Sequence, residues 1–327
     1  MSNLSLFTAD HHGFYHNGNP FFPLIQEQAS PHVDGANVVI LRLPARLNND
    51  LNWAEEKKLA TQIIASGKAI LWEIDLGLSD FQFTPDHSAA FFSFSIAIEE
   101  FTKTIWPQFQ QMTLGVSLYS GNFPSKRNFP FIHWESAFSD WLEEFNVDSL
   151  EYYYDLYCIQ MLSEYLNRLI SFLPESILPF ALIDATPICS PGKIAHLFSK
   201  ERFEFIQLVL KGTKFFSSGI CWEEDLPTQG IMKQPSFVPS LGLYLPKDES
   251  INTTLIKELD QMIFYLHGKQ IPFRMIPEEK LTEQWDGIEK LMIPSHPISV
   301  QGRRKLLGFI AAGGIVTTLE GEEFKFS

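Results

Sequence analysis

The chain has 327 residues, of which 45% are hydrophobic and 20% are charged, and its formal net charge is −14. This length predicts either one large barrel or two domains, and the composition is that of a globular protein. The negative charge argues against a nucleic-acid partner, because binding phosphate groups requires a cationic surface. The acidity is uneven: residues 1–240 hold 15 Lys/Arg and 27 Asp/Glu, whereas residues 241–327 hold 10 and 12.

The three cysteines are odd in number and none has a CxxC neighbour: Cys158, Cys189 and Cys221. We therefore expect structural thiols in a reducing compartment. The N-terminus has no basic segment followed by an apolar run, and the most apolar helical stretch is shorter than the roughly 20 residues that span a bilayer. These features predict a cytoplasmic protein with no membrane partner, no cofactor and no metal.

Residues 4–25 predict a β-hairpin that leads into a further strand. Leu4–Thr8 and Gly13–His16 flank a turn, and Asn17-Gly18-Asn19-Pro20 has strong turn chemistry. The histidines of this region admit a metal site, but exposed histidines at a hairpin tip are the interpretation that we favour for His11, His12 and His16.

From residue 37 the pattern alternates strands with helices. Asn37–Leu43 is apolar except for Arg42 and predicts a strand. Asn52–Gly67 predicts a helix that Asn52 caps, with Glu55 at the capping-box position and Gly67 at its end. A second helix is expected from Pro85 to about Phe109, and a strand over Thr113–Tyr119.

The strand predicted at Ala69–Leu78 lies between these two helices. Its composition is that of a strand buried on both faces, yet it carries Glu73 and Asp75. Residues two apart on a strand point the same way, so both carboxylates should leave one face of the sheet near the carboxyl end of the strand. Burial of an unpartnered charge is costly, so this placement requires a partner or a function.

The middle of the chain is less regular. Residues 120–148 are rich in aromatic residues, Gly and Pro, and a lid or binding loop and a surface subdomain are equally good interpretations. Further elements are expected at Leu150–Leu173 (helix), Leu178–Ala185 (strand), Lys193–Lys200 (helix), Phe203–Lys211 and Phe215–Trp222 (strands). Glu223–Ser240 contains three prolines and predicts a linker or a domain boundary.

The last 87 residues predict a small doubly wound α/β unit with a parallel sheet. Its expected strands are Leu241–Leu245, Pro272–Ile276, Lys290–Ile293 and Ile315–Leu319. Its expected helices are Thr253–His267 with Gly268 as the stop, a short one over Pro277–Gln284, and Val300–Ala312.

Two stretches resemble parts of a known family. GFYHNGNPFFPLIQEQ, residues 13–28, is similar to the entry hairpin of many TIM-barrel glycoside hydrolases. Residues 241–319, with LGLYLP and EKLMIPSHPISVQGRRKLLGFIAAGGIVTTL, resemble the module that follows the barrel in family 42 β-galactosidases and is related to class I glutamine amidotransferases. The resemblance covers about a third of the chain, and it implies a (β/α)8 TIM-like barrel followed by a small Rossmann- or flavodoxin-like domain.

The sequence departs from this family where its catalytic residues would stand. No Asn-Glu dipeptide occurs in the chain, so the general-acid Glu of those hydrolases has no counterpart. Residues 241–327 contain no Cys for an amidotransferase nucleophile, and Pro246–Asn252 has no glycine-rich phosphate loop. A nucleophile elbow (GxSxG) and the zinc spacings HxH and HExxH are also missing from the sequence.

If residues 22–222 form a barrel, the carboxyl ends of its strands meet on one face. Glycoside hydrolysis uses two facing carboxylates, and aromatic rings support a sugar. The preferred pair is Glu73 or Asp75 with Asp184, and Glu135 or Glu223 is an alternative second acid from a loop. Candidate substrate-binding residues are Glu27, Arg42, Tyr119, Glu135, Trp222 and Glu223. The alternative is that Arg42 bridges to Glu73 or Asp75 as a structural ion pair.

Taken together, the sequence predicts a TIM-like barrel with an N-terminal hairpin over residues 1–235 and a Rossmann-like domain over 240–327. A carbohydrate is the expected ligand, and assembly into a homo-oligomer is left open. Two functions compete: a glycoside hydrolase, and a catalytically degenerate relative that binds a sugar or another protein. The strand-end acids favour the first and the missing Asn-Glu favours the second.

Overall fold

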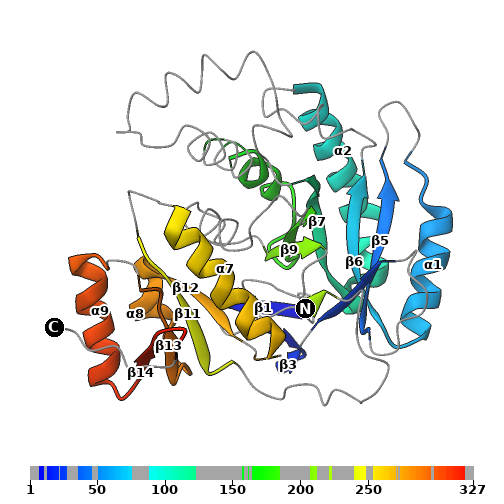
Figure 1. Cartoon of the computed structure of the whole chain (residues 1–327). Helices are drawn as coiled ribbons and strands as arrows, with labels where there is room; N and C mark the ends of the chain where they lie inside the picture. The colour runs from blue at the N-terminus through cyan, green and yellow to red at the C-terminus, as the bar shows by residue number, and fades with distance from the viewer. Residues whose placement is uncertain are drawn as a thin grey trace.

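The structure is a computed structural model of the whole chain. It describes residues 7–10, 13–21, 23–27, 36–45, 51–75, 88–122, 157, 161, 164–184, 207–211, 221–222, 239–247, 253–269, 271, 273–295 and 298–320. Among these residues two parallel sheets and one antiparallel sheet form a mixed α/β protein (Figure 1).

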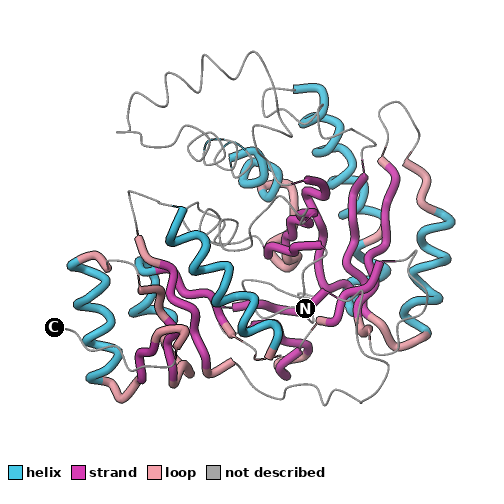
Figure 2. Tube along the Cα trace, in the orientation of Figure 1, coloured by secondary structure: helices cyan, strands magenta, loops and turns pink. Residues whose placement is uncertain are grey.

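The larger sheet contains seven strands in the order β10-β4-β5-β6-β7-β8-β9, and every neighbouring pair is parallel. Cα atoms of β9 and β10 come within 8 Å of each other, so the two edges of the sheet approach one another. The strands therefore follow one another in chain order from β4 to β10, and β10 pairs with β4; Figure 2 shows several of them side by side. Their bounds are β4 Leu24–Glu27, β5 Val38–Pro44, β6 Ala69–Asp75, β7 Thr113–Asn122, β8 Pro179–Asp184, β9 Gln207–Lys211 and β10 Cys221–Trp222.

Helices cover the outer face of this sheet. They are α1 (Ala54–Ala65), α2 (Ser88–Thr104) and α3 (Trp106–Phe109), and a 3-10 turn, η2 (Gln110–Met112), follows α3. Buried side chains of the strands, such as Leu41, Trp72 and Val116, pack here against Ala60 of α1 and Phe101 of α2. The indole N–H of Trp72 donates to the Thr113 hydroxyl at 2.9 Å, so this large ring is buried without an unpaired polar atom.

The start of α1 differs from the expected capping box. The helix begins at Ala54, and the capping position is held by Trp53, whose side chain makes no cap hydrogen bond. Instead, the Trp53 indole N–H donates to the carbonyl of Pro44 at 2.8 Å, which ties the helix to the end of β5. Asn52 still accepts a bond from the Ala54 N–H at 3.3 Å. Packing of the large ring has thus shifted the cap by one residue, whereas Gly67, with φ +81°, ends the helix as predicted.

The inner face of the sheet is apolar at the amino ends of the strands. Val38, Leu71, Leu114 and Phe180 belong to one buried cluster there. The N-terminal sheet, made of β1 (Phe7–Asp10), β2 (Gly13–His16) and β3 (Asn19–Phe21), adds Phe7 and Phe14 to that cluster. The predicted hairpin is confirmed, since β1, β2 and β3 pair antiparallel and residues 17 and 18 form the turn between the last two.

His16 lies against this small sheet rather than at an exposed tip. Its ring stacks on Phe7 with centroids 4.1 Å apart, and burial lowers its pKa below the usual 6.5 despite a backbone hydrogen bond to Gln111. The folded protein therefore takes up a proton on His16 less readily than the unfolded chain does. The exposed-tip interpretation of His16 is wrong, because its neighbours in the antiparallel sheet are aromatic.

This burial predicts a pH effect on stability. The contribution of His16 is fully present above pH 6.5 and is lost as the pH falls through the depressed folded pKa. Urea titrations across this range should show a smaller pH dependence for His16→Gln than for the wild type. An identical pH dependence in the two proteins would contradict the assignment.

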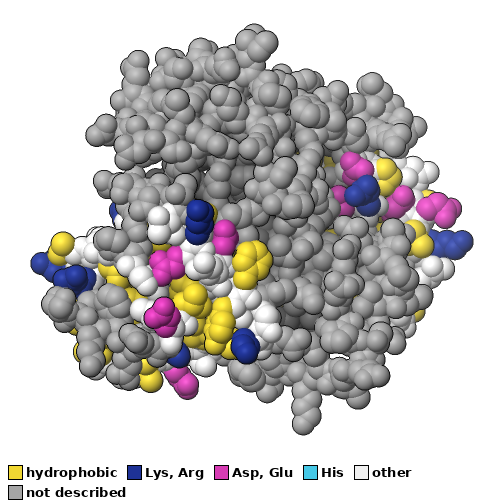
Figure 3. All heavy atoms as spheres, in the orientation of Figure 1, with side chains coloured by type: hydrophobic (Ala, Val, Ile, Leu, Met, Phe, Trp, Pro, Cys, Tyr) yellow, Lys and Arg dark blue, Asp and Glu magenta, His cyan; other side chains and the backbone are white. Residues whose placement is uncertain are grey.

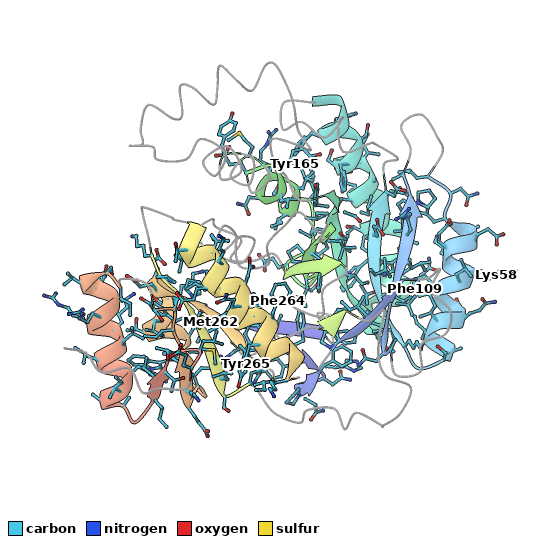
Figure 4. All side chains as sticks on the ribbon, in the orientation of Figure 1. Lys58, Phe109, Tyr165, Met262, Phe264 and Tyr265 are labelled. Atoms are coloured by element: carbon cyan, nitrogen blue, oxygen red, sulfur yellow. The ribbon has the colours of Figure 1, made fainter. Side chains whose placement is uncertain are left out.

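The second parallel sheet has the order β12-β11-β13-β14. Helix α7 packs on one face of this sheet, and α8 and α9 pack on the other (Figure 1). Met262 of α7 lies in the cluster on the first face, whereas its neighbour Phe264 is 60% exposed (Figure 4). The bounds are β11 Leu241–Leu245, α7 Thr253–Gly268, β12 Arg274–Pro277, η3 Glu278–Lys280, α8 Leu281–Gln284, β13 Lys290–Met292, α9 Val300–Ala311 and β14 Ile315–Thr317.

The expected parallel α/β arrangement of residues 241–319 is confirmed, with strand ends shifted by at most two residues. In the central region, Tyr157, Met161 and residues 164–170 are helical, within the helix expected over Leu150–Leu173. The helix expected at Lys193–Lys200, residues 123–148 of the aromatic excursion and most of the linker over Glu223–Ser240 lie outside the described residues.

Candidate functional site

Arg42, Glu73 and Asp75 come together on the inner face of the larger sheet. The Nη2 atom of Arg42 lies 3.3 Å from Oε1 of Glu73, and the Nη1 atom of Arg42 lies 3.8 Å from Oδ2 of Asp75. The Glu73 side chain is 6% exposed, that of Asp75 35% and that of Arg42 58%. Both contacts of the predicted ion pair are therefore present, and one cation is shared by two carboxylates.

Strand register explains why these side chains meet. Arg42 pairs with Glu73 across β5 and β6, and Glu73 pairs with Ser117 across β6 and β7. Directly paired residues of neighbouring strands lie on the same face of a sheet. On each of these strands the preceding inner residues are apolar, so the inner face changes from apolar to polar at the level of Arg42 and Glu73. The polar level lies toward the carboxyl ends, where barrel proteins place their sites.

Register also assigns a face to candidates whose side chains the structure does not describe. Asp184 follows Phe180 and Leu182 of the inner cluster at two-residue intervals and pairs with Asn122 and Lys211. Glu27 pairs with Ile40 of the same cluster, and Trp222 pairs with Ile25. These positions share the face of Glu73.

Tyr119 lies on the opposite face. It pairs with Ala181 and is 5% exposed within the outer cluster, beside the helices. The register of β7 with β8 shifts between Ser117 and Tyr119, so one extra residue, Leu118, intervenes and the alternation changes phase. Simple period-2 counting from the sequence could not detect this bulge. The remaining candidates, Glu135 and Glu223, lie outside the described residues.

Two inner-face positions were missed by sequence reasoning. Ser117, which is 1% exposed, donates its hydroxyl to the carbonyl of Tyr119 at 2.7 Å. Asn122 pairs with Asp184 at the carboxyl end of β7. Asn122 could have been found from its position, because it stands three residues after the apolar strand predicted over Thr113–Tyr119. The predicted strand ends at Tyr119, whereas the observed strand continues to Asn122.

The described residues hold no group of three or more His, Cys, Asp or Glu side chains suited to a metal ion. Within the same described ranges, no helix is both long and apolar enough to cross a bilayer. Described side chains of both charge signs are interspersed on the face seen in Figure 3.

No protein-family model matches the sequence, and no curated protein matches it. Among solved structures, the chain is similar to a β-galactosidase from Rahnella sp. R3, with 7% identity and a TM-score of 0.46, over 86% of this chain and 66% of that one. A GH42 β-galactosidase gives 9% identity and a TM-score of 0.47 over the same shares. An exo-β-1,4-mannosidase from Opitutaceae bacterium strain TAV5 gives 10% and 0.46, over 95% and 79%.

The chain thus spans just under two thirds of the length of either β-galactosidase.

The chemistry open to the site follows from its charges. Glu73 is buried beside a guanidinium, an arrangement that suits a nucleophile, a base or a structural ion pair. A general acid has to carry a proton, so a second carboxyl group away from Arg42 is needed for that role. The position of Asp184 lies on the inner face two strands from Glu73 and pairs with that of Lys211.

Proposed function

We propose that this protein binds a carbohydrate at the carboxyl end of a TIM-like barrel and is related to the glycoside hydrolases. The observation that carries the proposal is the inner-face cluster of Arg42, Glu73 and Asp75, whose face the positions of Glu27 and Asp184 share. Carboxylates and a guanidinium are hydrogen-bonding partners for sugar hydroxyl groups. Trp222, on the same face, would supply an apolar surface for a sugar ring.

Binding without turnover is the function that we favour over hydrolysis. Glu73 and Asp75 share the charge of Arg42, which is the arrangement expected of a structural pair, and the sequence lacks the Asn-Glu of the hydrolases that it resembles. If the protein does hydrolyse glycosides, Asp184 is the proposed general acid, and Glu73 or Asp75 is the nucleophile or base. Tyr119 is left out of the proposed site because it packs on the outer face.

The division of the chain is part of the same proposal. Residues 1–235 would form the barrel with its N-terminal hairpin, and residues 240–327 a Rossmann- or flavodoxin-like domain. In support, the buried clusters of residues 7–182 and of residues 243–316 share no member. A cytoplasmic location stays a prediction.

The experiment that tests this function compares three proteins: wild type, Asp184→Asn and Glu99→Gln. Glu99 is an exposed acid on the outer helix α2 and provides the matched control for a carboxylate-to-amide change. Each protein is incubated with p-nitrophenyl β-galactoside and β-mannoside, and its melting temperature is measured with and without the corresponding oligosaccharides. Binding to the folded state raises the melting temperature by mass action.

Under the favoured function, no aryl glycoside is hydrolysed, an oligosaccharide raises the melting temperature of wild type and Glu99→Gln, and the rise is reduced in Asp184→Asn. Under the hydrolase alternative, turnover occurs and falls roughly 100-fold or more in Asp184→Asn, since acid catalysis contributes at least that much. Absence of both turnover and stabilisation would reject the carbohydrate ligand. An equal response of the two variants would remove Asp184 from the site.

A further inference from the structure

The second sheet contains a carboxylate that is almost completely removed from solvent. Glu278 is 2% exposed and stands directly after β12, at the first position of η3. An ionised carboxyl group accepts hydrogen bonds and cannot donate them, so a buried one needs several donors around it. The donors around Glu278 come from three separate parts of the unit.

Each of these donors lies at the carboxyl edge of the sheet or at the helix that follows it. The Tyr244 hydroxyl of β11 donates to Oε2 of Glu278 at 2.6 Å, and the backbone N–H of Lys247 donates to the same oxygen at 3.1 Å. The Ser299 hydroxyl donates to Oε1. Ser299 is the N-cap of α9 and accepts the Gly302 N–H at 2.9 Å, so the carboxylate is linked to the positive end of that helix.

The position of this carboxylate within the fold is informative. In a doubly wound sheet, the chain leaves the first strand in one direction and later crosses to its other side, and ligands bind between the loops at that reversal. Here the reversal lies between β11 and β13, because β12 is on one side of β11 and β13 on the other. Lys247 follows β11, and Ser299 lies between β13 and α9, so Glu278 reaches across this point.

The residues around Glu278 pack closely against its carboxyl group. A Cβ added to Gly302 would collide with the Tyr244 hydroxyl and with the Glu278 carboxyl group, at 2.5 Å from its Oε2. Burial and the hydrogen bond to Glu278 raise the pKa of Tyr244 far above its usual value, so this hydroxyl keeps its proton and remains a donor. The Nζ of Lys305 fixes the backbone of the same turn by donating to the carbonyls of Glu278 at 2.8 Å and Glu279 at 2.6 Å.

We propose that Glu278 is a built-in ligand: its carboxylate fills the anion-binding position of the second unit, which the chain therefore closes against small anions. The carboxylate accepts from two hydroxyl groups and one backbone N–H beside the N-terminus of α9, where the helix dipole also favours an anion. The inference concerns residues 241–320 only and does not depend on a carbohydrate ligand. Its consequence is that removal of the side chain leaves a site for a small carboxylate.

The test is rescue of Glu278→Ala by acetate. Thermal unfolding of the full-length chain is followed in sodium acetate and in sodium chloride of equal ionic strength, at several concentrations. Glu278→Gln serves as a variant that fills the same volume, and Glu279→Ala serves as a control for loss of a neighbouring, half-exposed acid. A crystal structure of Glu278→Ala grown with acetate would identify the occupied position.

We expect acetate to raise the melting temperature of Glu278→Ala increasingly with concentration. The melting temperatures of wild type, Glu278→Gln and Glu279→Ala should each be the same in acetate as in chloride. Equal responses of Glu278→Ala in the two salts would overturn the proposal. If Glu278→Ala does not fold in chloride, acetate must restore its folded circular dichroism spectrum, and Glu278→Ser must show the same acetate dependence. Failure of acetate in both variants overturns the proposal as well.

Discussion

Replacement of Glu278 by alanine is expected to destabilise the second unit by about 3–5 kcal/mol, because it removes the shared acceptor of three hydrogen-bond donors. The variant leaves the Tyr244 hydroxyl, the Ser299 hydroxyl and the Lys247 N–H without their acceptor. Each abandoned buried donor costs about 1–3 kcal/mol. Glu278→Gln should cost less, about 2 kcal/mol, since its amide oxygen still accepts while its NH2 group opposes a donor.

Urea denaturation with hydrogen exchange of the β11 and β12 amides measures this loss, because the two sheets need not unfold in one transition. Glu279→Ala is the matched control: its carboxylate is 45% exposed and lies 3.8 Å from Lys247, so its removal should change the free energy of unfolding by about 0.5 kcal/mol or less. Equal losses in Glu278→Ala and Glu279→Ala would show that the buried network adds no stability.

The second large effect is expected at Gly115, where β7 and β8 approach closely. A Cβ at this position would collide with the Leu178 carbonyl oxygen and the Phe180 ring, 2.7 Å from its Cδ2. The Leu178 carbonyl is held in place because it accepts the Val116 N–H at 3.0 Å. Since the obstacle is hydrogen-bonded backbone, Gly115→Ala should destabilise the larger sheet by about 1–3 kcal/mol, and Gly115→Val by more.

Chemical denaturation of Gly115→Ala and Gly268→Ala separates this collision from a general effect of removing glycine. Gly268 ends α7, no heavy atom lies within 4 Å of its added Cβ, and its φ is not positive. Alanine there should be neutral or slightly stabilising, because it restricts the unfolded chain. A Gly115→Ala protein as stable as Gly268→Ala would mean that β8 moves away from β7 at little cost.

Local sequence pattern was sufficient for the central part of the candidate site. Glu73 and Asp75 stand two residues apart in a strand, and Arg42 interrupts the strand before it, so a shared face and an ion pair could both be predicted. The same local logic located Gly67 at the end of α1 and the strands of the second sheet. Each of these features depends on the properties of consecutive residues.

The face of Tyr119 could not be predicted in this way. Its position depends on a register shift between β7 and β8, and a bulge reflects how two strands fit together rather than the composition of either one. The burial of His16 is a comparable case, since its stacking partner Phe7 lies on a neighbouring strand.

The sequence by itself determined the alternation of strands and helices and the acids on one inner face, because both are periodic properties of the chain. Only the tertiary structure revealed the role of Glu278, which the sequence placed in a short, polar helix. Its hydrogen-bonding partners Tyr244, Lys247 and Ser299 are 34, 31 and 21 residues away. The role of this buried charge depends on donors that are distant in the sequence. Strand order and helix placement bring these donors together.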